Sequence, residues 1–308
     1  MIEVHQFEDS GAGEPYAAPS VLPPLGRFAV ATVWAAGAFW GSGFVYSLFP
    51  HRDLVPGLLF RLIACALTAA GFAFFLRVLD YNNSPLPAAL GLPFNFSAGR
   101  TWFTGFALGA LLITADVLIV ACFGSLRWHF HVSSHTLLRS VAVVALLFIG
   151  ALLEEISFRG YPFQKLIEAL GAFWAVVALS ALFGAVHLWN PDAKGFLSWA
   201  FLNTLLVGLL FALARIRTGS LWFSFGLHFG WNLFQGAVFG LPVSGLREFS
   251  TVVVATVYGS SALTGNAYGP EASATCTIVL VVALPLLWWL TTPRNIQQTP
   301  GLPPPIGI

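Results

Sequence analysis

Five polar residues lie inside or at the ends of long apolar segments, and their types are those of a water-activating site. Glu154 and Glu155 close one apolar run, His187 ends a second, and His228 and Asn232 lie within a third. Ionisable residues at membrane depth are costly and usually mark a functional site. A glutamate can take a proton from water, an imidazole can orient that water, and an amide can donate to an oxyanion. These groups together predict hydrolysis of a carbonyl compound such as a peptide.

Helical spacing predicts which of these side chains lie on the same face of a helix. Glu155 and Arg159 are four residues apart, so they can form an ion pair along one helix face. Glu154 is rotated by about 100° from Glu155 and can face a cavity instead. His228 and Asn232 are also four residues apart and share a face. Taken singly, these motifs also fit a solvated helix end, a capping histidine or a hydrogen bond between packed helices. One shared cavity would satisfy all of them.

Metal binding is left open by the sequence. The HExxH motif of many zinc proteases does not occur, so an ion would have to be gathered from separate helices. The possible ligands are Glu154, His187 and His228, and Zn²⁺ is the divalent metal that these donors suit. No other cofactor is expected.

Composition identifies an integral membrane protein. The chain has 308 residues, of which 57% are hydrophobic and only 9% are charged, whereas ordinary soluble domains carry roughly a quarter. The net charge of +1 gives no case for nucleic-acid binding, which needs a concentrated basic face. Membrane lipids and a membrane-associated protein or peptide are the partners to expect. The oligomeric state is not specified.

The apolar runs predict an all-α, polytopic membrane protein with about eight transmembrane helices, because about 20 residues are needed to cross a bilayer. Residues 1–27 are expected to form a flexible tail, 28–292 a single membrane domain and 293–308 a disordered tail. The segment 249–263 is shorter and is expected to be a partial or peripheral helix, or part of a ninth element. The eight spans are 28–49, 56–79, 101–123, 138–158, 171–189, 198–214, 220–240 and 272–292.

The motifs occur in a recognisable order along the chain. They are Glu154-Glu155-x-x-x-Arg159, Phe183-x-x-x-His187 and His228-x-x-x-Asn232. In this order they resemble the motifs of the CAAX prenyl protease and bacteriocin-processing family of intramembrane proteases, often called CPBP or Abi. The resemblance covers a protease-like core at about 138–240, and three matched motifs are far more specific than any one alone.

The resemblance implies a membrane-embedded peptidase with a defined division of roles. Glu154 would be the catalytic base, His187 would help to activate water, and His228 with Asn232 would stabilise the oxyanion or hold a metal. The supporting residues would be Glu155, Arg159 and Phe183. Eukaryotic relatives cleave prenylated CaaX tails, but this specificity is not carried over. The substrate expected here is a membrane-associated or lipidated protein or peptide.

One geometric problem arises from the predicted spans. At about 1.5 Å per residue, Glu154 and His187 would each lie about 24 Å into antiparallel helices, near opposite membrane faces. We expect the fourth span to start later and to run past Arg159 to a break near Gly160 and Pro162.

Two rival functions and the orientation remain open. The rivals are a proton-coupled transporter and a non-catalytic protein that binds or protects membrane proteins. Lys and Arg are somewhat more frequent in the segments that lie inside if both termini are inside, so the positive-inside rule favours N-in and C-in. A bacterial plasma membrane is the expected location.

Overall fold

The computed structural model describes residues 22–48, 54–123, 125–133 and 135–291, and it confirms an all-α, polytopic membrane protein. The α-helices run in the order α1 (Pro24–Ser47), α2 (Leu54–Val78), α3 (Leu86–Ala89), α4 (Ala98–Cys122), α5 (Thr136–Arg159), α6 (Tyr161–Leu170), α7 (Ala172–Val186), α8 (Trp199–Thr218), α9 (Leu221–Leu233), α10 (Ser261–Thr264) and α11 (Ala274–Leu290). Two strands lie between these helices, β1 (Leu126–Phe130) and β2 (Val253–Val257). Three short helices of other types also lie between them: the 3₁₀-helices η1 (His187–Trp189) and η3 (Pro270–Ala272), and the π-helix η2 (Phe234–Val238).

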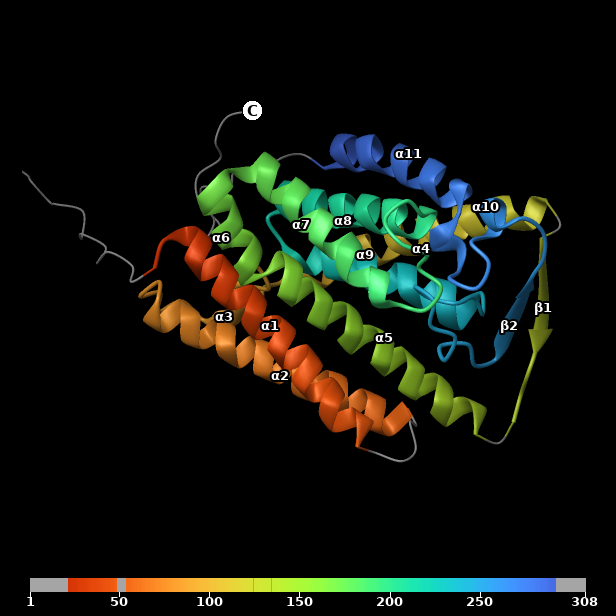
Figure 1. Cartoon of the computed structure of the whole chain (residues 1–308), viewed down its shortest axis with the longest axis horizontal. Helices are drawn as coiled ribbons and strands as arrows, with labels where there is room; N and C mark the ends of the chain where they lie inside the picture. Colours follow the sequence, from red (N-terminus) through yellow and green to blue (C-terminus); the bar gives the residue numbers. More distant parts are fainter. Residues whose placement is uncertain (1–21, 49–53, 124, 134, 292–308) are drawn as a thin grey trace, which may run out of the picture.

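Six helical segments in the described ranges are long and apolar enough to cross a membrane, rather than about eight. The predicted spans 220–240 and 272–292 are helical, but α9 has only 13 residues before it continues as the π-helical turn η2, and α11 has 17. Figure 1 shows α9 enclosed by the other helices, with α11 along one edge. The other two predicted spans are thus helical as well, but each is too short to be counted with the six by length.

The tail boundaries differ slightly from the expectation. Helix α1 begins at Pro24, so four residues assigned to the N-terminal tail are helical. Proline is favoured in the first turn of a helix because its missing N–H would have no partner there. The remainder of that tail up to residue 21, and the tail 293–308, lie outside the described residues.

The prediction of a helix over 249–263 was wrong. Its centre is strand β2, which pairs antiparallel with β1 so that Trp128 lies opposite Ala255. Three valines and a threonine make up most of β2, and β-branched side chains pack well on a pleated surface. The short helix α10 follows. This two-stranded sheet lies at one end of the molecule, beyond the helices (Figure 1).

Helices α4 and α9 approach backbone to backbone through four glycines. A Cβ added at Gly105 or Gly109 would lie 2.1 Å from the carbonyl oxygen of Phe223 or 2.0 Å from that of Leu227. The reciprocal positions on α9 are Gly226 and Gly230, where a Cβ would lie 2.1 and 2.2 Å from α4 carbonyl oxygens. Small residues four apart allow such close packing of membrane helices. This glycine contact fixes α9, which carries His228 and Asn232.

Helices α5, α6 and α7 bring Glu154 and His187 to one level. Helix α5 starts at Thr136, not later as expected, but it does end at Arg159, with Gly160 at the break. The chain then continues through the ten residues of α6 before α7 returns. Beyond Glu154 the chain follows the last residues of α5 and then α6, which leaves in a new direction at Gly160, before α7 returns toward the level of Glu154. Because α6 extends beyond the end of α5 (Figure 1), the two side chains meet rather than lie at opposite faces.

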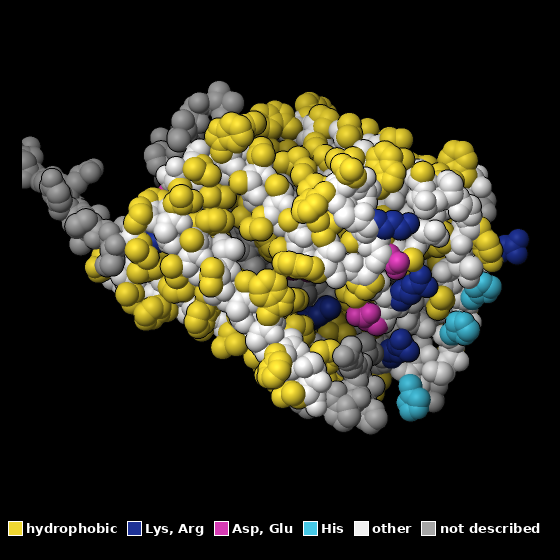
Figure 2. All heavy atoms as spheres, in the orientation of Figure 1, with side chains coloured by type: hydrophobic (Ala, Val, Ile, Leu, Met, Phe, Trp, Pro, Cys, Tyr) yellow, Lys and Arg dark blue, Asp and Glu magenta, His cyan; other side chains and the backbone are white. Residues whose placement is uncertain are grey.

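The surface in view is largely hydrophobic, as expected for helices that face lipid. In Figure 2 hydrophobic side chains cover most of the helical body, whereas most of the visible charged and histidine side chains gather toward the end that carries β1 and β2. Apolar side chains exposed to a bilayer carry no hydrophobic penalty, since lipid tails are equally apolar.

Candidate active site

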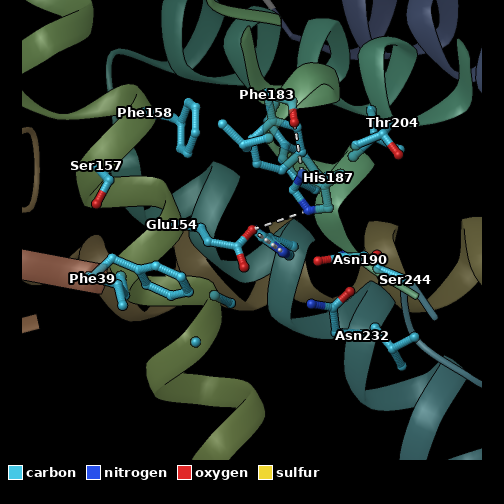
Figure 3. A pocket seen from close by; sticks show the side chains of 18 of the residues that line it. Phe39, Glu154, Ser157, Phe158, Phe183, His187, Asn190, Thr204, Asn232 and Ser244 are labelled. Carbon is cyan, nitrogen blue, oxygen red and sulfur yellow. Dashed lines mark hydrogen bonds and ion pairs between the residues drawn. The ribbon is translucent and has the colours of Figure 1, made fainter. Parts of the chain in front are cut away.

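Glu154 on α5 is the centre of the site. Its Oε2 atom lies 3.9 Å from Nε2 of His187 on η1 and 3.8 Å from Nε2 of His228 on α9. Figure 3 shows the Glu154 carboxylate pointing toward the His187 ring. This oxygen is enclosed, yet it has no hydrogen-bond partner among the described residues. The structure thus places the acid and both predicted histidines around one point, at separations that suit a bridging water.

The outer nitrogens of both rings are occupied by acceptors. Nδ1 of His187 lies 2.7 Å from the carbonyl oxygen of Phe183, and Nδ1 of His228 lies 3.1 Å from Oε1 of Glu155. A carbonyl or carboxylate oxygen can only accept, so each Nδ1 carries the proton. In a neutral ring Nε2 is then the acceptor, and two lone pairs face the oxygen of Glu154. A water between these groups can donate its two protons to two of the three acceptor atoms.

Glu155 has a different environment from its neighbour, as the helical rotation predicted. The Glu155 side chain is 0% exposed, whereas that of Glu154 is 37% exposed toward the cavity. Arg159 lies 3.3 Å from Oε1 of Glu155 and donates to the carbonyl oxygen of Gly208 on α8. Glu155 therefore links the guanidinium to the His228 ring. It holds this ring but does not face the cavity.

Aromatic rings pack against the side chains of Arg159, His187 and His228 and hold them in place. The Arg159 guanidinium lies 4.2 Å from the centre of the Phe183 ring, which is a cation–π contact. Phe183 also contacts the His187 ring at 4.5 Å between centroids, and Phe211 stacks on His228 at 4.7 Å. Such contacts fix the ring planes. Phe183 thus acts twice, through its carbonyl and through its ring.

A cavity of about 480 Å³ opens beside these groups. Glu154, both site histidines, Asn232 and Asn190 line it. In Figure 3 the side-chain amides of Asn232 and Asn190 lie on the same side of the site, below His187. No hydrogen bond to either amide occurs within the described part of the chain, so both can donate to a ligand. Asn190, just after the His187 motif, was not predicted as a site residue.

The segment after α9 adds two lining residues whose role the sequence did not reveal. Glu271 accepts hydrogen bonds from the backbone N–H of Ser244 at 2.5 Å and from its hydroxyl at 3.0 Å. Asn203 on α8 donates to the carbonyl oxygens of Glu271 and Ser273, at 2.8 and 2.7 Å. Burial raises the pKa of the Glu271 carboxyl, because desolvation disfavours its charged form. These bonds fix the loop that closes the cavity.

Glu154, His187 and His228 have the donor chemistry of a metal site. A carboxylate and two imidazole Nε2 atoms, with each Nδ1 held by an acceptor, resemble the ligands and outer partners of protein zinc. As placed, however, no group of three or more His, Cys, Asp or Glu side chains in the described ranges is arranged to hold an ion. The three side chains therefore do not fit an ion in this arrangement.

Fold and site together define a polytopic membrane protein with a buried acid–imidazole centre. Residues 136–234 match the family described as type II CAAX prenyl endopeptidase Rce1-like, and this match confirms the predicted resemblance to the CAAX protease family. The matched segment runs from the first residue of α5 to just beyond α9, so it contains all three motifs.

The chain is also similar to a curated protein whose printed name gives no activity. The uncharacterized protein YyaK of Bacillus subtilis (strain 168) is 28% identical over 157 residues, which is 47% of this chain. The chain spans about half the length of this relative, 46%. No solved structure matches the chain significantly.

Proposed function

We propose that this protein is an intramembrane endopeptidase that hydrolyses a peptide bond of a membrane-associated or lipidated protein or peptide. The observation that carries the proposal is the convergence of two imidazole Nε2 atoms on one unpartnered oxygen of Glu154, at 3.8 and 3.9 Å. The Glu154 carboxylate and the acceptor Nε2 of His187 can hold a water with both of its protons engaged, and His228 lies beside them. The oxygen lone pair of this water is then free for attack.

The reaction follows from the proton positions. Glu154 removes one proton from the water, while Nε2 of His187 accepts a hydrogen bond from the other. The water oxygen bonds to the substrate carbonyl carbon, and the carbonyl oxygen becomes an oxyanion. Glu154 then passes its proton to the amide nitrogen, and the C–N bond breaks. The products are a carboxylic acid and an amine.

The two histidines have different roles because their outer partners differ. His187 bonds through Nδ1 to the Phe183 carbonyl, so its Nε2 can accept a hydrogen bond from the water. His228 bonds through Nδ1 to the Glu155 carboxylate, which orients the ring as the aspartate of a catalytic triad does. When Nε2 of His228 carries a proton it donates to the oxyanion, and the Asn232 amide supplies a second donor.

The substitution Glu154→Gln tests the catalytic role. We expect a fall in turnover of about 100- to 10,000-fold, the usual contribution of a general base, with an unchanged melting temperature. The measurement is cleavage of membrane peptides by protein reconstituted in nanodiscs, with products identified by mass spectrometry. A non-catalytic binding protein would keep its phenotype in this variant, and a proton-coupled transporter would lose pH-dependent flux without cleaving anything.

A divalent ion such as Zn²⁺ at Glu154, His187 and His228 stays a proposal with its own test. A ligand that binds only the folded state raises stability by about 2.7 kcal/mol at a concentration of 100 Kd. From the present arrangement we expect neither chelator nor Zn²⁺ to shift the melting temperature. A Zn²⁺-dependent rise that His187→Ala removes would show that the three side chains close around an ion.

The location we propose is a bacterial plasma membrane with both termini inside. The imbalance of Lys and Arg between alternate connections supports this orientation. Single-cysteine labelling with a membrane-impermeant reagent, at residues 22 and 291 in a variant without its three native cysteines, tests it. Labelling of intact cells at either end would contradict it.

A further inference from the structure

Glu271 of η3 is an acid in the cavity wall that the proposed reaction does not use. Its side chain is buried and lines the same cavity as Glu154. Its polar partners among the described residues are neutral donors, namely the backbone N–H and hydroxyl of Ser244 and the amide of Gln235. Arg61 on α2 also lines the cavity, but no Lys or Arg in the described ranges forms an ion pair with Glu271.

The loop that closes the cavity does not need an ionisable group at this position. The hydrogen bonds from Ser244 need only an oxygen acceptor, which the side chain of a glutamine would also supply. Other bonds hold the same loop: the N–H of Gly245 donates to the carbonyl oxygen of Tyr268 at 2.7 Å, and Gln235 donates to that of Pro242 at 2.6 Å. Because a buried carboxylate without a cation is unfavourable, an acid of this kind in the wall of a ligand cavity points to a cationic ligand group.

Glu271 lies near the groups that act on the peptide bond in the proposed reaction. It interacts through space with His187, the ring whose Nε2 lies 3.9 Å from Glu154. In Figure 3 Ser244, which binds Glu271, lies on the same side of the site as Asn232, with Glu154 on the other side of the His187 ring. The cavity of about 480 Å³ has the size of a site for a drug-sized ligand. A side chain that reaches Glu271 therefore belongs to a residue next to the reacting bond.

We propose that Glu271 binds the cationic side chain of a lysine or arginine next to the scissile bond of the substrate. An ammonium or guanidinium group forms charge-assisted hydrogen bonds with a carboxylate. The long apolar stem of either side chain packs against apolar surface while its charged end reaches a polar group, and mostly apolar side chains line this cavity. This inference rests on the proposed function. It makes Glu271 a specificity-determining residue that selects peptides with a basic residue beside the cleaved bond.

Binding is measured first, in a protein that does not turn over. The Glu154→Gln protein in phosphatidylcholine nanodiscs is incubated with a pool of N-acylated random peptides that contain lysine, mixed with the same pool after acetylation of every lysine. Bound peptides are counted by mass spectrometry. We expect the unmodified peptides to be enriched about 30-fold or more, the usual effect of one partner in a buried charge pair. Adding Glu271→Gln should abolish this enrichment, whereas binding of the acetylated peptides should not change.

Two matched controls come from the same part of the chain. Glu248 is exposed and is not among the residues that line the cavity, so Glu248→Gln removes the same charge outside it and should leave the enrichment unchanged. Ser244→Ala removes one hydrogen bond to Glu271 but keeps the carboxylate, and it should also keep the enrichment. If Glu271→Gln weakened both forms of the peptides equally, Glu271 would only hold the loop and the proposal would be overturned. If phosphatidylethanolamine in the nanodisc removed the preference for lysine, the ligand would be a lipid ammonium group, which would also overturn it.

Turnover separates this inference from the proposed function. With protein that retains Glu154, cuts should fall next to lysine or arginine, and acetylated peptides should be cut about 30-fold less efficiently. Enrichment of lysine peptides that depends on Glu271, without any cut that depends on Glu154, would support the cation site and reject the peptidase. Cuts that depend on Glu154 but ignore basic residues would support the peptidase and reject the cation site.

Discussion

At the scale of single residues, Arg159, Glu155 and His228 form a buried chain that ends at the cavity. The guanidinium holds the carboxylate at 3.3 Å, and the carboxylate holds Nδ1 of His228 at 3.1 Å. A buried ion pair is a poor source of net stability, but removal of one partner leaves an uncompensated charge. The chain therefore serves to orient the imidazole, and its stability depends on both ends being present.

Replacing the central acid should affect stability and turnover separately. Glu155→Gln keeps an acceptor for His228 but leaves Arg159 unpaired, so we expect a loss of about 3–5 kcal/mol in unfolding free energy. Turnover should fall by up to about 10,000-fold, the cost of replacing the aspartate that orients the histidine of a catalytic triad. Thermal melting and peptide cleavage in nanodiscs measure the two effects.

A double variant distinguishes orientation from stability. Glu155→Gln with Arg159→Gln removes both charges and should regain most of the melting temperature without regaining turnover. Full turnover in this double variant would show that the carboxylate does not orient His228.

Much of the site was predictable because its chemistry is unusual for its surroundings. Glu154, His187 and His228 are ionisable residues in apolar segments, and the structure brings them together; their catalytic roles stay predictions. Arg61 and Glu271 could not be placed in the cavity from spacing alone. Arg61 lies on a distant helix, and Glu271 lies in a loop whose path depends on hydrogen bonds to Ser244 and Asn203.

At the scale of helices, the glycine contact between α4 and α9 decides where His228 lies. Two pairs of glycines, each four residues apart, let the two backbones meet. The sequence contains this signal as Gly105-x-x-x-Gly109 and Gly226-x-x-x-Gly230. His228 lies between the glycines of the second pair, so any side chain added there displaces the histidine.

A single methyl group should disrupt this contact. In Gly230→Ala the new Cβ would lie 2.2 Å from the carbonyl oxygen of Phe106, and overpacking of this kind costs about 1–3 kcal/mol. We expect a lower melting temperature and reduced turnover. Gly41→Ala on α1 is the matched control, because its Cβ meets nothing within 4 Å. If the two variants had the same melting temperature and the same turnover, close packing of α4 and α9 would not be required for stability.

Helix boundaries were harder to predict than helix existence. The break after Arg159 was expected from Gly160 and Pro162, and the structure has it. The early start of α5 and the role of α6 were not expected, since hydrophobicity does not show that a helix continues beyond the span in a new direction. Segment 249–263 was misassigned because its apolar residues suit a strand as well as a helix. Its partner β1 is more than 100 residues away in the sequence.

At the scale of the whole molecule, a buried ionic cluster joins elements that are distant in sequence. Asp80, just after α2, pairs with Arg27 of α1 and, at 3.0 Å, with Lys165 of α6. Glu168 of α6 lies 2.7 Å from the same lysine. Helix α6 sets the level at which α7 returns, so this cluster stabilises the geometry that the site needs.

Removing the shared acid should destabilise the protein without changing its chemistry. Asp80→Asn leaves Arg27 and Lys165 with one acid fewer, and the expected loss is about 3–5 kcal/mol. Turnover per folded molecule should not change, because the cluster does not line the cavity. Asp192→Asn, at an exposed position, is the control. If fully folded Asp80→Asn protein showed a lower turnover, the ionic cluster would act on the site directly.

The hydrogen bond from His187 to the Phe183 carbonyl links the position of this imidazole to the stability of the end of α7. The last carbonyls of a helix have no partner within it, and this imidazole satisfies one of them near the end of α7. When the end of α7 frays, this hydrogen bond breaks and the His187 ring is no longer held in the cavity. Local unfolding of α7 and displacement of His187 are therefore expected to occur together. Amide hydrogen exchange around Val186 should accelerate in His187→Ala, so an inactive His187 variant would report on local melting as well as on missing chemistry.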